Sequence, residues 1–281
     1  MMTGTNLLNT FRIDLKCLRA VKIGNNAGAK AVTLTLPGVQ NSGRWLFEPH
    51  CESLKQRDGC GEFMLLDYTE RFNLADASYE LANLLFHIAP YYDTIYLDGV
   101  SCGARVFVQA IIELYLRKEQ AVLNKIVFNS IDGVISPQDV KTSSFNLAKV
   151  LPGWLALILT PFLKWVHRKG WRKEAASYDK LDDEMIIKLN TDANQRISWR
   201  LLKQQVAAMN TPLQSFSRQI SIKQCVVVTS IDDEVIDNQH NFNSLSGLLK
   251  PLRQVELPTK HSTLAYQPDV WREGFYTICC Y

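Results

Sequence analysis

Apolar and polar residues follow two patterns that alternate along the chain. Short, mostly apolar runs typical of buried strands occupy residues 31–36, 63–66, 94–97, 125–129 and 225–229, with a weaker run at 254–257. Longer stretches between them, such as residues 76–88 and 104–116, place apolar side chains at helical spacing. Parallel strands need crossover connections, so this order predicts a mostly parallel, twisted sheet with helices on both faces.

The beginning of the pattern differs from the rest. Residues 11–23 alternate between apolar and polar side chains, which predicts an antiparallel hairpin at the edge of the sheet. The helix expected over 76–88 has Asp76 or Ser78 available as its N-cap.

The pattern changes after position 134. Residues 135–215 show helical periodicity without a convincing strand, and strand-like runs resume only afterwards. We therefore predict a helical cap or lid inserted into a core formed by residues 1–134 and 216–281. Within the insertion, residues 150–166 are rich in apolar and aromatic side chains, and residues 167–173 are basic.

The most specific motif connects a predicted strand to a predicted helix. Residues 99–103 read Gly-Val-Ser-Cys-Gly, with Ser101 at the centre. A serine at such a turn has a cramped backbone geometry, and glycines two positions away on either side avoid collisions with it. In this setting the GxSxG pattern predicts a nucleophile elbow, and a buried structural serine is the alternative.

The order of these parts resembles the α/β-hydrolase superfamily over nearly the full length. That family places an elbow after a middle strand, a helical insertion before the next-to-last strand, an acid after it and a histidine after the last strand. The resemblance implies that Ser101 is the nucleophile and His261 the general base, because His261 follows the last expected strand. The other histidines precede the elbow, lie in the insertion or follow the acid too closely, and are interpreted as surface or packing residues: His50, His87, His167 and His240.

The acid is expected in the loop that follows the run at 225–229. Family members carry an aspartate, one variable residue and two aliphatic residues in this loop, and Asp233 matches that register. Two alternatives remain open: Asp232 is the adjacent residue, and Asp132 follows the run at 125–129, where some relatives carry their acid.

The resemblance also implies an oxyanion site made of two backbone amides. The amide of Cys102 follows the nucleophile at a helix N-terminus, where the helix dipole favours negative charge. In the loop after the first buried strand the family often has His-Gly-aliphatic, and this chain has Pro37, Gly38 and Val39, so the amide of Val39 matches the second donor. The missing histidine is one departure from the family pattern, and Ala104, where many relatives have glycine, is another.

The composition and charge of the chain argue against several classes of function. The chain has 281 residues, 47% of them hydrophobic, so it can bury a large core. Its net charge of +3 is small and gives no electrostatic reason to expect nucleic-acid binding. Seven cysteines without framework spacing fit a reducing compartment, and with no secretory signal or spanning segment we expect a cytoplasmic protein. Metal-ligand spacing and nucleotide-binding motifs are also missing, so we expect no metal and no cofactor.

These features predict a serine hydrolase that cleaves a carboxylic ester through an acyl-serine intermediate. Trp154, Phe162 and Trp165 are expected to line an apolar acyl pocket under the cap. The expected partner is a small-molecule ester or thioester, and the basic segment 167–173 suits an acyl carrier or a peripheral membrane contact. The alternatives are a thioesterase or acyltransferase acting on a carrier-bound acyl group, and a catalytically silent binding module of the same fold.

Overall fold

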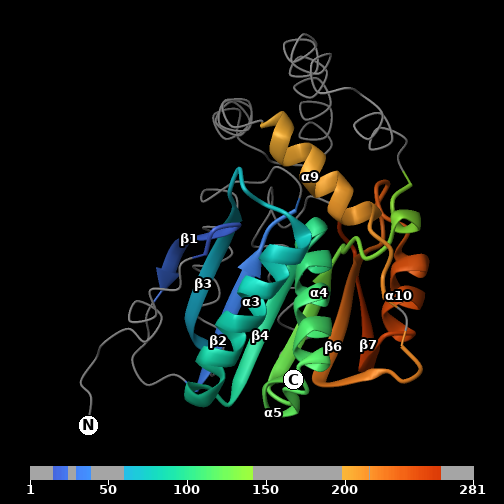
Figure 1. The fold of residues 1–281 in the computed structure, drawn as a ribbon. Coiled ribbons are helices and arrows are strands. Elements are labelled where there is room, and N and C mark those ends of the chain that lie inside the picture. The colour runs from blue at the N-terminus through green and yellow to red at the C-terminus, as the bar shows by residue number, and fades with distance from the viewer. Residues whose placement is uncertain (1–14, 25–29, 39–59, 142–197, 215, 261–281) are drawn as a thin grey trace.

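A seven-stranded sheet forms the centre of the molecule (Figure 1). The computed structural model describes residues 15–24, 30–38, 60–141, 198–214 and 216–260. Within these ranges the strand order is β1-β3-β2-β4-β5-β6-β7, and every neighbouring pair is parallel except β1 and β3. The mostly parallel sheet expected from the sequence is confirmed.

The elements follow the predicted order. The strands are β1 (Leu18–Gly24), β2 (Ala31–Leu36), β3 (Cys60–Tyr68), β4 (Thr94–Val100), β5 (Ile126–Ile131), β6 (Ile220–Ser230) and β7 (Leu249–Leu257). The helices are α3 (Leu74–Ile88), α4 (Cys102–Leu116), α5 (Gln120–Leu123), α9 (Trp199–Asn210) and α10 (Asn238–Ser246), with short 3-10 turns η1 (Ala89–Tyr91) and η2 (Pro137–Asp139). Several strands extend beyond the apolar runs, because polar residues at their ends continue the hydrogen-bonded ladder.

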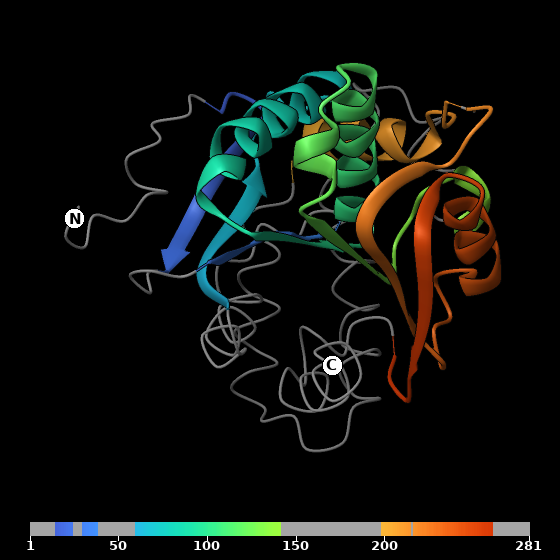
Figure 2. The same ribbon diagram turned by 90° about the horizontal axis from the view of Figure 1, so that it is seen from below.

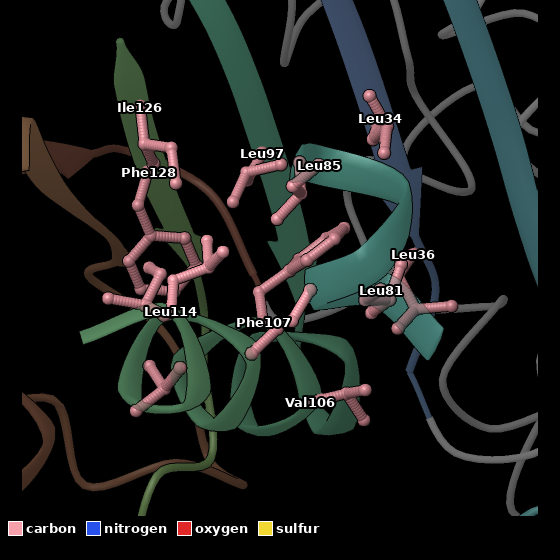
Figure 3. Packing of buried hydrophobic residues seen from close by; sticks show 14 of the residues in the cluster. Leu34, Leu36, Leu81, Leu85, Leu97, Val106, Phe107, Leu114, Ile126 and Phe128 are labelled. Carbon is pink, nitrogen blue, oxygen red and sulfur yellow. The ribbon is translucent and has the colours of Figure 1, made fainter. Parts of the chain in front are cut away.

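Helices α3 and α4 lie on the same face of the sheet (Figures 1 and 2). Their apolar sides meet side chains from β2, β4 and β5 in one core, which includes Leu34, Leu85, Leu97, Phe107 and Phe128 (Figure 3). All five of these side chains are fully buried. Burying a side chain of this size contributes about 1.5–3 kcal/mol, so the core fixes α4 against β4 and holds the turn between them.

One of two local predictions differs from the structure. β1 pairs antiparallel with β3, and the hairpin expected over residues 11–23 stays a prediction because its first part lies outside the described residues. Helix α3 begins at Leu74 rather than near Asp76, and its N-cap is Asn73, whose side chain accepts a hydrogen bond from the Asp76 amide at 2.8 Å. Ser78 is not a cap either, because it lies one turn inside the helix and its hydroxyl donates to the Leu74 carbonyl.

Part of the predicted cap can be compared with the structure. Residues 142–197 lie outside the described part of the chain, whereas α9 belongs to the predicted insertion and is described. Helix α9 packs on α4, with Leu201 and Ala208 buried in the main core. The end of this segment is therefore joined to the sheet domain. Among the described residues, no helix is both long and apolar enough to span a membrane.

Candidate active site

The candidate residues lie where parallel strands end. Ser101 follows β4, Asp132 follows β5, Asp233 lies in the loop after β6, and residues 258–260 follow β7. Parallel strands have their carboxyl ends at one edge of the sheet, and ligand sites of open α/β sheets form at that edge. In Figure 1 this edge lies on the side of α9.

Ser101 has the backbone geometry that the GxSxG pattern predicts. Its φ of 49° and ψ of −116° place it in a region that residues with side chains rarely adopt. Three hydrogen bonds hold this conformation: the Ser101 amide donates to the Ile131 carbonyl at 2.9 Å, and the Ser101 carbonyl accepts from Ala104 and Val134, each at 3.1 Å. The residues on both sides are buried, whereas Ser101 itself is partly exposed. The sharp turn thus brings a serine to the surface.

The two glycines of the motif allow close packing around this turn. A Cβ on Gly99 would lie 2.6 Å from the Cα of Ala104, and a Cβ on Gly103 would lie 2.1 Å from the carbonyl oxygen of Leu36. Gly99 therefore lets α4 fold back on β4, and Gly103 lets the end of β2 touch the first turn of α4. The GxSxG pattern predicts that both glycines make space around Ser101, whereas the contacts show that they make space for Ala104 and Leu36. The methyl group of Ala104 is buried within this packing.

The segments expected to form the oxyanion site meet beside the elbow. Cys102 is the first residue of α4, and the first amides of a helix have no acceptor within the helix. After β2, Pro37 and Gly38 are buried, and the Pro37 carbonyl accepts a hydrogen bond from the Tyr68 hydroxyl at 2.7 Å. The start of the loop that leads to Val39 is therefore fixed next to α4.

The thiol of Cys102 has a packing role. It is fully buried in a small apolar cluster with Val134, Val206, Met209 and Ile236. Burial raises the pKa of this thiol to about 12, so it is protonated at neutral pH and is not a nucleophile.

A buried arginine next to the elbow was not expected from the sequence. Arg105 is fully buried, and its guanidinium donates to the carbonyls of Ala208 at 3.4 Å, Thr211 at 3.0 Å and Pro212 at 3.4 Å. Burial lowers its pKa to about 10, which leaves it charged at neutral pH. The positive charge lies at the C-terminal end of α9, where the helix dipole favours it. Its only signal in the sequence is that it is the single cation in the mostly apolar stretch 104–116.

Asp233 is held by the loop in which it lies. Its side chain is buried, and Oδ1 accepts hydrogen bonds from the amides of Val235 at 2.7 Å and Ile236 at 2.9 Å. The Asp233 carbonyl accepts a hydrogen bond from Nζ of Lys141 at 3.1 Å. Both amides bind the same carboxylate oxygen, so they orient the carboxylate without using Oδ2 themselves.

Asp132 is held differently. It is buried and has a φ of 40°. Its Oδ1 accepts from the Ser230 amide and its Oδ2 from the Ser230 hydroxyl, both at 2.7 Å. That hydroxyl oxygen also lies 3.0 Å from the Thr259 hydroxyl and 3.2 Å from the Lys260 carbonyl. Asp132 thus connects the end of β5, through Ser230, to the residues immediately before His261.

The other predicted site residues are either exposed or outside the described part of the chain. Asp232 is exposed, and its amide donates to the Thr259 carbonyl at 3.1 Å. Five predicted site residues lie outside the described part of the chain: His261, Val39, Trp154, Phe162 and Trp165. No group of three or more metal-binding side chains is found among the described residues.

His240 belongs to a partly buried polar contact. Its Nδ1 lies 2.6 Å from Oδ1 of Asp139, a fully buried carboxylate. Oδ2 of the same carboxylate accepts from the amides of Ile135 at 2.6 Å and Ser136 at 2.8 Å. The contact joins η2 to α10, which supports the interpretation of His240 as a packing residue. No sequence pattern predicts its partner, Asp139.

Structural comparison defines the fold. No family model and no curated protein matches the chain by sequence. Solved structures match it over most of its length. YbtT, a type II thioesterase from the yersiniabactin pathway, has a TM-score of 0.60 at 12% identity and covers 93% of this chain and 97% of its own.

Two further structures agree. BorB, a type II thioesterase from the borrelidin biosynthetic cluster, has a TM-score of 0.57 at 14% identity over 92% of this chain and 95% of its own. The carboxylesterase CesB from Bacillus subtilis has a TM-score of 0.53 at 13% identity over 92% and 86%. Together with the sheet order, these matches show that the chain has the α/β-hydrolase fold, as the sequence predicts.

Proposed function

We propose that this protein is a serine hydrolase that cleaves an ester or thioester of a carboxylic acid through an acyl-serine intermediate. The observation that carries the proposal is the positive φ of 49° at Ser101, in a turn between a parallel strand and a helix. Such strain persists only where the surroundings enforce it, and it is concentrated at functional sites. The thioesterases and the carboxylesterase among the similar structures support the same reaction class.

The proposed reaction has two halves. Ser101 Oγ attacks the substrate carbonyl while His261 takes its proton and passes it to the leaving alcohol or thiol. Asp233 orients the imidazole and stabilises the imidazolium. The amides of Cys102 and Val39 bind the negative oxygen of each tetrahedral intermediate. Water, deprotonated by His261, then attacks the acyl-serine, which releases the carboxylic acid and restores the serine.

Asp233 is the better candidate for the acid. Both carboxylate oxygens of Asp132 accept hydrogen bonds from Ser230, an arrangement that suits a structural link to the end of β7. The carboxylate of Asp233 is oriented by two amides of its own loop, those of Val235 and Ile236. Its position also follows the register of the resemblance.

We further propose that residues 135–215 form a cap near Ser101, with Trp154, Phe162 and Trp165 lining an acyl pocket. Helix α9, at the end of this segment, packs on α4 beside Cys102, which supports a cap close to the nucleophile. The substrate is then a small-molecule or carrier-bound ester or thioester with an apolar acyl group.

Labelling with a fluorophosphonate probe tests the proposed reaction. The parent protein is expected to react at the peptide that contains Ser101, because the probe mimics the tetrahedral intermediate and traps only activated serines. Ser101→Ala is expected to remain unlabelled, and Ser221→Ala, which changes an exposed serine in β6, is expected to react like the parent. A parent that is folded by circular dichroism but resists the probe would support the silent binding module instead.

The acyl pocket is tested with p-nitrophenyl esters of increasing chain length. Each buried methylene contributes about 0.8 kcal/mol, so hexanoate is expected to exceed acetate by at least about tenfold in kcat/KM. Equal rates along the series would contradict an apolar pocket. Thioesters with the same acyl groups test whether the enzyme prefers a thiol or an alcohol as its leaving group. A higher kcat/KM for the thioesters would identify a thioesterase.

A further inference from the structure

We infer that Tyr68 is a positioning residue for the oxyanion site, a role that rests on the proposed hydrolase function. Tyr68 is the last residue of β3, and β3 lies beside β2 in the sheet. Its side chain is buried, and its ring packs edge-on against Phe72 with the centroids 4.9 Å apart. The ring is therefore fixed, and the hydroxyl reaches the loop after β2.

The first contact of the hydroxyl orients a peptide in that loop. It donates to the Pro37 carbonyl at 2.7 Å. Because a peptide bond is planar, fixing this carbonyl also fixes the direction of the Gly38 amide. On the elbow side, the same carbonyl oxygen lies 2.9 Å from where a Cβ on Gly103 would stand. The Pro37–Gly38 peptide is thus held between Tyr68 and the elbow.

Tyr68 also lies beside the thiol of Cys102 in the elbow, and burial, followed by this neighbour, holds the pKa of Tyr68 well above its usual value. The phenol therefore keeps its single proton, which it donates to Pro37. One side chain links the two segments that carry the proposed donors, the amides of Cys102 and Val39.

The hydrogen bond from Tyr68 takes the place of a loop contact that this sequence lacks. The chain has Pro37 where family members often have a histidine, so that source of support for the loop is lost. Tyr68 supplies a buried hydrogen bond to the residue at that same position. Oxyanion donors stabilise the transition state more than the bound substrate. A loss of positioning should therefore lower kcat and leave KM nearly unchanged.

Tyr68→Phe tests this inference, because it removes the hydroxyl and keeps the ring that packs on Phe72. We expect kcat to fall by about 10- to 100-fold, less than the full loss of an oxyanion donor, with KM within about twofold of the parent. Tyr92→Phe is the matched control. Tyr92 is also buried, and its hydroxyl donates to Glu62 near the amino ends of the strands, so this variant is expected to keep the parent kcat.

A transition-state analogue separates positioning from general structure. The inhibition constant of a trifluoromethyl ketone carrying the substrate's acyl group is expected to rise in Tyr68→Phe by the factor by which kcat/KM falls. Inhibition by the product carboxylic acid is expected not to change. Cys102→Ala, a second variant, removes the thiol beside Tyr68 together with its packing in the small apolar cluster, and should lower kcat by about two- to fivefold at constant KM.

The outcomes distinguish this inference from the function on which it rests. If the parent neither reacts with fluorophosphonate nor hydrolyses any ester, the proposed function fails. If the parent is active and both folded variants keep its kcat, or if Tyr92→Phe loses as much kcat as Tyr68→Phe, the role of Tyr68 is wrong.

Discussion

Asp233→Asn is expected to lower kcat for ester hydrolysis by about 10³- to 10⁴-fold, with little change in KM. Asparagine has nearly the same shape and can keep the contact between its side-chain oxygen and the amides of Val235 and Ile236. It has no charge to stabilise the imidazolium, and it favours the wrong histidine tautomer. Steady-state kinetics on the ester that the parent hydrolyses best measures this loss.

Asp132→Asn is the comparison that decides between the two buried carboxylates. The Asp132 carboxylate accepts two hydrogen bonds from Ser230, and an asparagine side chain has only one oxygen to accept them. We expect a loss of about 1–3 kcal/mol in the free energy of unfolding, measured with urea, and a kcat within about tenfold of the parent. Asp232→Asn, at an exposed side chain, should change neither quantity. A larger loss of kcat in Asp132→Asn than in Asp233→Asn would make Asp132 the acid.

Gly103→Ala is expected to lower the free energy of unfolding by about 3 kcal/mol, the upper part of the usual range for overpacking. The new Cβ would lie 2.1 Å from the Leu36 carbonyl oxygen and 2.8 Å from its carbonyl carbon. Both are backbone atoms of a buried strand, so neither can rotate away. The end of β2 must separate from α4, and labelling by fluorophosphonate should fall together with stability.

Gly247→Ala provides the control for this substitution. Gly247 has a φ of −73°, and a Cβ there would meet only the carbonyl oxygens of Asn243 and Ser244, each at 3.7 Å. Alanine is compatible with this conformation and reduces the entropy of the unfolded chain, so stability should stay the same or rise by about 0.4–1 kcal/mol. Urea unfolding monitored by circular dichroism compares the two variants. Equal stability changes in both would contradict the close approach described for Gly103.

Neighbouring residues in the sequence predict the order of the elements and the sharp turn at Ser101. Apolar runs mark buried strands, helical spacing marks α3 and α4, and the motif around Ser101 needs only neighbouring residues to be recognised. These signals are local, because each depends on residues a few positions apart. The same locality explains the errors at the ends of elements. Asn73 was missed as the N-cap of α3 because several polar residues near that point could cap a helix equally well.

The contacts that support the elbow became known only from the folded chain. The hydroxyl of Tyr68 reaches Pro37 across 31 residues of sequence, Ser230 binds Asp132 across 98, and Arg105 reaches Ala208 across 103. Such partners are chosen by strand order, register and helix packing. None of these leaves a pattern among neighbouring residues, because a buried polar group can be satisfied by any suitable partner that the fold brings within about 3 Å.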